Sequence, residues 1–282
     1  MNVPSALLSA LQTSVRVVDN RLHRLELRIK KRRLGRREER DRSLEFISRV
    51  FDCDARAYLQ ELESSTFRVE YRRRLAQLDS AVPGHSGTSS EFDCETLYVT
   101  VRAAKPRVVV ETGVLFGAFS AHILEALSRS GGGSLVSFDM PERHGRNELK
   151  DYLVPEALRP ARRLILGDTR RTLASELQRL QSVDMFNHDS WHVFSHMMWE
   201  FLIADKHLSP GGALCSHDVL ETPRRPNAFP LFAEARDYTY GVFRNFGVAR
   251  KNRLSVSEAK LHAAASGMRR GPAATDEYSL EP

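Results

Sequence analysis

The sequence predicts an α/β protein: a doubly wound, mainly parallel sheet of seven strands that follows a helical arm. From about Phe92 to Arg250, short β-branched runs alternate with helical segments. This order is typical of a parallel sheet with helices on both faces. Before residue 83, apolar residues recur at helical intervals instead. The 282 residues, of which 41% are hydrophobic, suffice for one large α/β domain and an extension.

The N-terminal arm is expected to span residues 1–82. Apolar residues recur there at alternating spacings of three and four, at Leu8, Leu11, Val15, Val18, Leu22, Leu25 and Ile29. This heptad pattern favours a parallel two-stranded coiled coil, and hence a homo-oligomer, while an amphipathic helix on its own domain is the alternative. The basic run at residues 30–42 is a solvated helix face or hinge, or contacts an anionic surface. Residues 43–79 are expected to form one or two further helices.

A turn-rich linker over residues 83–91, which contains PGHSGTSS, separates the arm from the main domain at residues 92–253. The strands are expected at Arg107–Glu111, Ser134–Asp139, Arg163–Leu166, Val183–His188 and Ala213–Ser216, with a strand pair near Tyr240–Arg250. The helices are expected at Glu95–Ala104, Ala118–Ser128, Asn147–Leu158, Arg171–Leu180, Trp191–His207 and Phe229–Asp237. Ser209–Gly212 is expected to end the long helix before it. The tail, residues 254–282, has the composition of a disordered segment.

Charge and composition narrow the classes of function. The whole net charge of +6 comes from residues 1–80, which contain 18 Lys and Arg and 12 Asp and Glu. The rest of the chain contains 24 basic and 24 acidic residues and is neutral. A neutral main domain argues against a nucleic-acid duplex as the partner, since phosphate neutralisation dominates such binding. Three cysteines without paired spacing predict reduced thiols in a cytoplasmic protein. No apolar run approaches the roughly 18–20 residues that span a bilayer, and no signal peptide is expected.

The segment VVVETGVLFGAFS, at Val108–Ser120, has the pattern of a strand, a turn with two glycines and a helix. Gly113 can adopt a positive φ, and Gly117 leaves room where a side chain would collide with a ligand or a strand. A dinucleotide-binding fingerprint needs glycine where this chain has Leu115, so a diphosphate fits poorly. An adenosine ligand without phosphates fits better, and S-adenosylmethionine (SAM) is the expected one.

Acidic residues follow five successive predicted strands: Glu111, Asp139, Asp168, Asp189 and Asp218. Ligands of open α/β sheets bind outside the carboxyl ends of the strands, so these residues should line one cleft. Asp139 is expected to accept hydrogen bonds from both ribose hydroxyls, and Asp168 to lie beside the adenine. The alternative for each acid alone is a helix cap or a turn.

The motifs ETGVLFGAFS, SFDM, LILGDT, VDMFNHDSWH and PGGALCSHDV, in this order, resemble those of class I SAM-dependent methyltransferases. The resemblance is strongest to the metal-assisted O-methyltransferases of sugars and natural products, and it covers about residues 92–250. It implies a Rossmann-like methyltransferase fold and SAM as the cofactor. The expected cofactor-binding residues are Glu111, Gly113, Phe116, Gly117, Ser120, Asp139, Asp168 and Asp189.

The chain departs from this branch where a second acid commonly precedes the aspartate of the fifth strand. His217 occupies that position, and Asp189, His217 and Asp218 are the expected ligands if a divalent metal such as Mg²⁺ or Mn²⁺ binds. An imidazole in place of an oxygen ligand weakens the case for Mg²⁺ and admits Mn²⁺, Zn²⁺ or no metal.

The expected catalytic residues are His192 and Asp189. His192 follows Asp189 by three residues, in the first turn of the expected helix, and an imidazole that titrates near neutrality can act as a general base. The alternative is a helix-terminal histidine that only bonds to Asp189. A zinc site on His188, His192 and His196 is disfavoured, because His188 belongs to the strand.

These expectations together favour a SAM-dependent methyltransferase that O-methylates a hydroxyl on a small molecule, a saccharide or a glycolipid. One alternative is a non-catalytic scaffold of the same fold that acts through coiled-coil association. Another is a nicotinamide oxidoreductase, which Leu115 disfavours. The residues of the variable segments do not identify the acceptor.

Overall fold

A computed structural model describes residues 35–82, 88–141, 149–220 and 227–252 of the chain. The predicted coiled-coil heptads and the predicted disordered tail lie outside the described residues, as does most of the predicted linker. Among the described helices, none is both long and apolar enough to cross a membrane.

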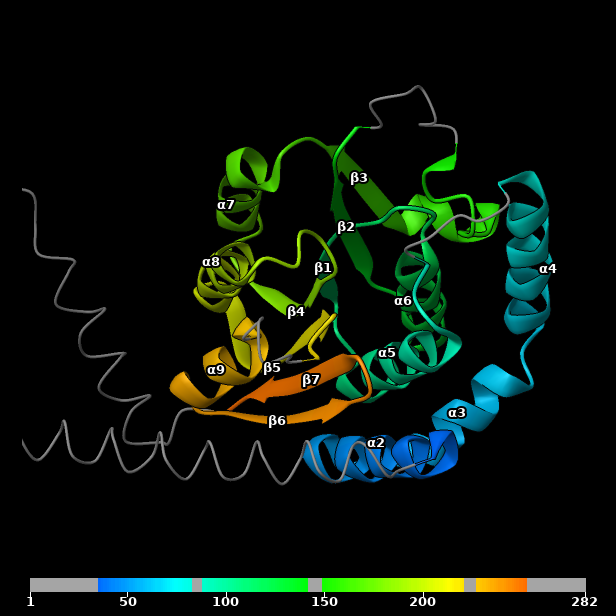
Figure 1. Cartoon of the computed structure of the whole chain (residues 1–282), viewed down its shortest axis with the longest axis horizontal. Helices are drawn as coiled ribbons and strands as arrows, with labels where there is room; N and C mark the ends of the chain where they lie inside the picture. The colour runs from blue at the N-terminus through cyan, green and yellow to red at the C-terminus, as the bar shows by residue number, and fades with distance from the viewer. Residues whose placement is uncertain (1–34, 83–87, 142–148, 221–226, 253–282) are drawn as a thin grey trace, which may run out of the picture.

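The described residues form a seven-stranded sheet with the strand order β3-β2-β1-β4-β5-β7-β6 (Figure 1). The strands are β1 (Val108–Thr112), β2 (Ser134–Asp139), β3 (Arg162–Leu166), β4 (Val183–His188), β5 (Leu208–His217), β6 (Tyr238–Phe243) and β7 (Phe246–Lys251). The first five are parallel, and β7 runs antiparallel to both β5 and β6. The predicted fold class is therefore confirmed.

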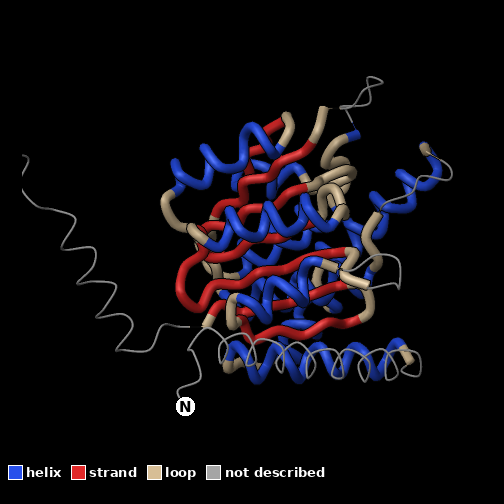
Figure 2. Tube along the Cα trace, turned by 60° about the vertical axis from the view of Figure 1, so that its left-hand side comes forward, coloured by secondary structure: helices blue, strands red, loops and turns tan. Residues whose placement is uncertain are grey.

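Helices cover both faces of this sheet (Figure 2). They are α2 (Arg36–Phe51), α3 (Ala55–Glu63), α4 (Thr66–Ala81), α5 (Glu91–Ala104), α6 (Ala118–Arg129), α7 (Thr169–Leu180), α8 (Phe194–Asp205) and α9 (Ala228–Ala235), with a 3₁₀ helix, η2, at Glu156–Ala161. Alternation along the strands supplies both cores: on β1, Val109 packs with the α5–α6 side, and Val110 packs with the α7–α9 side.

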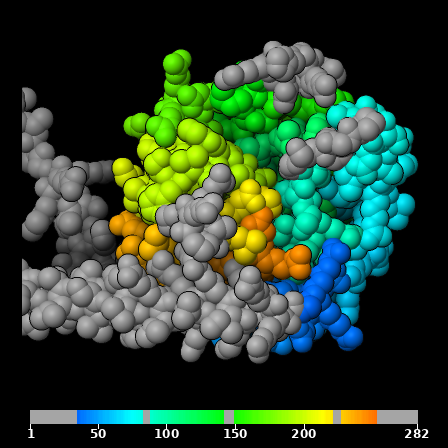
Figure 3. All heavy atoms as spheres, in the orientation of Figure 1, coloured from blue at the N-terminus to red at the C-terminus, as the bar shows by residue number. Residues whose placement is uncertain are grey.

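The N-terminal helices α2, α3 and α4 share the core of the α5–α6 side. Ile47 of α2, Leu62 of α3 and Tyr71 of α4 are buried in the same cluster as Leu97 of α5 and Ile123 of α6. The sequence predicted one or two helices here, and the structure has three because side-chain caps at Asp54 and Ser65 start α3 and α4 anew. In the space-filling view, α4 (cyan) forms one edge of the molecule (Figure 3).

Three predicted element boundaries were wrong. Helix α8 begins at Phe194 rather than Trp191, so His192 lies in the preceding loop and not in the first helical turn. Ser209–Gly212 belongs to β5, where a register shift against β4 accommodates the extra residues. The described part of Asn147–Leu158 contains turns and the start of η2, which Pro160 keeps from extending as an α-helix.

The register of the parallel strands places the predicted site residues at one edge. Thr112, at the end of β1, pairs with Phe138 of β2 on one side and with His188 of β4 on the other. His188 in turn pairs with Ser216 of β5. The residues that follow these strand ends are therefore neighbours in space, although up to about a hundred positions separate them in the chain.

Candidate functional site

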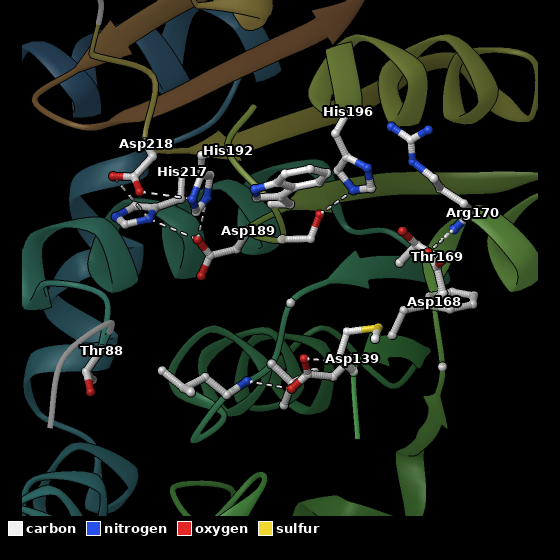
Figure 4. Close-up of a pocket in the computed structure, with 18 residues that line it drawn as sticks. Thr88, Asp139, Asp168, Thr169, Arg170, Asp189, His192, His196, His217 and Asp218 are labelled. Carbon is white, nitrogen blue, oxygen red and sulfur yellow. Dashed lines mark hydrogen bonds and ion pairs between the residues drawn. The ribbon is translucent and has the colours of Figure 1, made fainter. Parts of the chain in front are cut away.

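A cavity of about 860 Å³ opens at the carboxyl ends of the five parallel strands (Figure 4). The predicted residues that line it are Gly113, Asp139, Asp168, Asp189, His192, His217 and Asp218. Glu111, Phe116, Gly117 and Ser120 are not among its lining residues. Thr88, Arg170, Trp191 and His196 also line it, although no sequence motif predicted them there.

The turn after β1 needs both of its glycines. Gly113 and Gly117 have backbone φ angles of 83° and 84°, which residues other than glycine rarely adopt. A Cβ on Gly113 would lie 2.1 Å from the carbonyl oxygen of Asp189, and one on Gly117 would lie 2.9 Å from Cα of Asp151. The glycines thus make room for neighbouring backbone that packs against the turn, and not for the cavity.

Glu111 lies beneath the turn and not in the cavity, contrary to the expected cofactor contact. Its Oε1 accepts hydrogen bonds from the hydroxyls of Ser137, at 2.6 Å, and Ser120. Burial raises the pKa of the Glu111 carboxyl to about 7, and these two hydrogen bonds offset only part of that effect. Glu111 and Ser120 therefore join β1, β2 and the start of α6, which fixes the turn from below.

Asp139 lines the cavity, but its carboxylate is already engaged. Its Oδ2 accepts from the backbone N–H of Leu115 at 2.9 Å and from Nζ of Lys150 at 2.7 Å, and its Oδ1 accepts from the N–H of Met140 at 2.8 Å. A carboxylate offers about four acceptor positions, and the described residues occupy three of them, which leaves one on Oδ1. This position could accept one ribose hydroxyl, and the expected contact with both ribose hydroxyls stays a prediction.

Asp168 both lines the cavity and caps a helix. Its side chain accepts a hydrogen bond from the N–H of Arg170 at 2.9 Å, which starts α7. Asp168 is therefore a helix cap, which was the alternative for this residue. It also lies beside the ends of β2 and β3, at the edge of the sheet where the adenine was expected.

Asp189, His192 and His217 form a compact group at the other end of the cavity, which we call the Asp189 cluster (Figure 4). Oδ1 of Asp189 lies 2.9 Å from Nδ1 of His217 and 3.3 Å from Nε2 of His192. A second carboxylate faces the outer nitrogen of each ring: Asp218 Oδ2 lies 3.1 Å from His192 Nδ1, and Asp93 Oδ2 lies 3.4 Å from His217 Nε2.

In the Asp189 cluster, the carboxylate and the imidazoles each favour the charged form of the other. Burial alone would raise the pKa of Asp189, but the imidazoles of His192 and His217 beside its carboxylate outweigh burial and lower that pKa below its ordinary value. Burial likewise lowers the pKa of His217, yet the carboxylates of Asp189 and Asp93 raise it to about 10. Without a metal ion, His217 is thus a cation at neutral pH.

The Asp189 cluster is the group of described residues whose donor atoms lie close enough to share a metal ion, all within 4.8 Å of one another. The expected ligand set was Asp189, His217 and Asp218. The structure places His192 where Asp218 was expected, because Asp218 turns its Oδ2 to His192 and its Oδ1 to the side-chain amide of Asn245.

A second polar group, which no sequence motif predicted, lies behind the cavity wall. Glu200 of α8 is fully buried and contacts Thr112 Oγ1 at 2.6 Å, His188 Nδ1 at 2.7 Å, Ser190 Oγ at 3.0 Å and His196 Nε2 at 2.9 Å. Burial raises the pKa of Glu200, but the hydrogen bonds with both histidines outweigh it and hold that pKa well below its ordinary value. This group fastens the loop between β4 and α8, which carries His192. The four-residue spacing of His196 and Glu200 was the available signal.

Comparison with known proteins agrees with this geometry. Residues 110–219 match the family model described as a methyltransferase domain. The O-methyltransferase from Bacillus cereus, solved in complex with S-adenosylhomocysteine (SAH), is 16% identical, with 65% of this chain and 91% of that chain covered at a TM-score of 0.50. TomG from Streptomyces achromogenes, an O-methyltransferase of tomaymycin synthesis solved with SAM, is 18% identical, with 67% and 91% covered at a TM-score of 0.51.

At these identities the solved structures establish a shared fold. A search of curated protein sequences finds no significant match. The resemblance inferred from the motifs is confirmed to this extent: residues 110–219 match the methyltransferase domain model, and the described residues share the Rossmann-like fold of the two O-methyltransferases.

Proposed function

We propose that this methyltransferase domain transfers a methyl group from SAM to a hydroxyl of a small molecule, a saccharide or a glycolipid. The observation that carries the proposal is the single cavity in which the Gly113 turn, Asp139 and the Asp189 cluster meet. Its volume of about 860 Å³ lies in the range of small-molecule sites and leaves space for an acceptor beside the cofactor.

One end of the cavity suits the adenosine part of the cofactor, and the other end suits the acceptor. At one end, Asp139 retains an acceptor position for a ribose hydroxyl, and Met140 and Asp168 flank the place of an adenine. At the other end, the Asp189 cluster offers groups that exchange protons, and Trp191, 63% exposed, offers an apolar wall. The SAH and SAM complexes of the two compared O-methyltransferases support this choice of cofactor.

Methyl transfer needs alignment and removal of one proton, because the sulfonium is already an activated leaving group. The acceptor oxygen bonds to the methyl carbon while the S–CH₃ bond breaks, and the sulfur keeps the electron pair. In the metal-free site His192 takes the hydroxyl proton on Nε2 once its ring has turned this buried nitrogen toward the acceptor. Its side chain is 29% exposed at the cavity, and Asp189 and Asp218 orient its ring.

Calorimetry with SAM and SAH on the full chain tests the cofactor, and methyl-labelled SAM with pools of hydroxylated acceptors tests the transfer. We expect one SAM per chain and label in an ether-linked methyl group. Absence of both binding heat and thermal stabilisation by SAM contradicts the proposal, as does label that enters only amines or thiols.

A further inference from the structure

The three donor atoms of the Asp189 cluster have the spacing of ligands on one ion. Asp189 Oδ1 lies 2.9 Å from His217 Nδ1 and 3.3 Å from His192 Nε2. Two ligands at right angles on one ion, each about 2.1 Å from it, lie about 3 Å apart. All three side chains line the cavity, so an ion held by them would face the space assigned to the acceptor.

The outer nitrogens of both histidines have the partners that metal-ligating histidines require. His192 Nδ1 faces Asp218 Oδ2 at 3.1 Å, and His217 Nε2 faces Asp93 Oδ2 at 3.4 Å. Histidines that bind metals usually donate this other N–H to a carboxylate, which fixes the tautomer and turns the lone pair toward the ion. Here Asp93, on α5, and Asp218, directly after β5, are these two carboxylates.

Those tautomers would leave three lone pairs converging on one point. With N–H groups on the outer nitrogens, the inner nitrogens of His192 and His217 both direct lone pairs at Asp189 Oδ1. Among the described residues, the nearest partner of the buried His192 Nε2 is Asp189 Oδ1 at 3.3 Å, and the two atoms do not have the geometry of a hydrogen bond. A cation between the three atoms satisfies all of them at once.

We infer that Asp189, His192 and His217 form a two-histidine, one-carboxylate site for a divalent transition metal, with Asp93 and Asp218 as its outer carboxylates. Imidazole nitrogens favour later transition metals such as Co²⁺ or Zn²⁺, whereas Mg²⁺ and Mn²⁺ prefer oxygen ligands. The site therefore differs from an oxygen-ligated magnesium site both in ligand set and in metal.

The consequence for catalysis rests on the proposed function, but binding of the ion does not. A bound cation would supply a positive charge that lowers the pKa of an acceptor hydroxyl. His192 would then serve as a ligand, since its inner lone pair is occupied, rather than as the proton acceptor of the metal-free site.

The test uses the full chain, stripped of metal with a chelator, in the absence of SAM and acceptor. Co²⁺, Zn²⁺, Mn²⁺ and Mg²⁺ are titrated by calorimetry, and the Co²⁺ titration is also followed by visible absorption, which reports nitrogen ligands. We expect one ion per chain, with Co²⁺ and Zn²⁺ bound at least about 100-fold more tightly than Mg²⁺.

Variants separate this ligand set from the oxygen-rich alternative. His192→Gln should abolish the Co²⁺ absorption bands, while Asp218→Asn and Asp93→Asn should each weaken binding by about 10- to 100-fold. His207→Gln is the matched control, because His207 lies outside the cavity lining and contacts the carbonyl of Gln181. It should bind as the unmodified chain does, and thermal unfolding checks that each variant is folded.

Three results would overturn the inference: no ion bound, Mg²⁺ bound as tightly as Co²⁺, or unchanged Co²⁺ binding in His192→Gln. A SAM titration in parallel keeps the two proposals apart. SAM binding without ion binding removes only the metal site, and ion binding without SAM binding removes only the proposed methyl transfer.

Discussion

Gly113 and Asp189 are in contact through their backbones, so closely that a Cβ on Gly113 would overlap the carbonyl oxygen of Asp189 at 2.1 Å. The N–H of Asp189 also donates to the carbonyl of Thr112 at 2.8 Å. The turn expected to hold the cofactor and the loop that carries the Asp189 cluster are therefore one rigid unit. A change in one of them alters the position of the other.

Gly113→Ala should destabilise the protein far more than its backbone angle alone requires. A positive φ costs a residue with a Cβ about 1–2 kcal/mol, and the collision with Asp189 adds to this cost. Gly131→Ala is the control, because Gly131 has a φ of 92° and, apart from its chain neighbours, no atom of the described residues lies within 4 Å of the added Cβ. Urea denaturation of both variants should show a clearly larger loss for Gly113→Ala. Equal losses would mean that the loop moves aside.

Asp139→Asn should weaken SAM binding by about 10-fold, which corresponds to one lost hydrogen bond of a charged acceptor. The amide also cannot keep both the Lys150 ion pair and the bond from Leu115 N–H unchanged. Calorimetry with SAM measures the effect. Asp184→Asn serves as the comparison, since Asp184 bonds to the N–H of Arg107 at the opposite edge of the sheet. Undiminished affinity in Asp139→Asn would remove Asp139 from the cofactor site.

Glu111 should make stability fall as pH rises. Its pKa is about 7 in the folded protein and near 4.5 when unfolded, so the folded state binds the proton more tightly. The stabilisation is complete below pH 4.5 and is lost as pH rises through 7. Urea denaturation at pH 5 and pH 8 should show a decline that Glu111→Gln reduces. An identical pH dependence in both proteins would contradict a raised pKa at this position.

Glu200→Gln should cost about 2–3 kcal/mol of unfolding free energy, because one charged acceptor holds Thr112, His188 and His196 together without exposure to water. Glu70→Gln is the control, since Glu70 pairs with Arg73 and Arg74 at the surface, where such pairs contribute little. Thermal and urea unfolding of both variants compare them. The idea fails if the two losses are alike.

The carboxyl-end residues could be predicted because they depend on local pattern and on one rule of topology. Each β-branched run ends in an acid, and parallel strands end at one edge, so Asp139, Asp168 and Asp189 were placed together from the sequence. Glu111 shows the limit of this reasoning. Its pattern is the same, but it is followed by a turn that folds over it and buries it.

The residues that were missed depend on contacts between distant elements. Asp93 and Glu200 are polar residues within helices, and no local feature distinguishes them from solvated ones until α5 and α8 pack against the sheet. The exchange of Asp218 for His192 has a similar cause. Helix α8 begins later than its apolar pattern indicated, and the longer loop turns His192 inward.

Helix α5 belongs to two neighbourhoods at once. Asp93 faces His217 in the cavity, and two positions later Glu95 pairs with Arg40 of α2 at 2.7 Å and with Arg68 of α4 at 3.1 Å. Helices α2 and α4 therefore support, through α5, the side of the cavity on which His217 lies. A chain cut back to residues 110–219, which match the methyltransferase domain model, would lack both these helices and the Asp93 carboxylate, so we expect the cavity to lose its shape around His217.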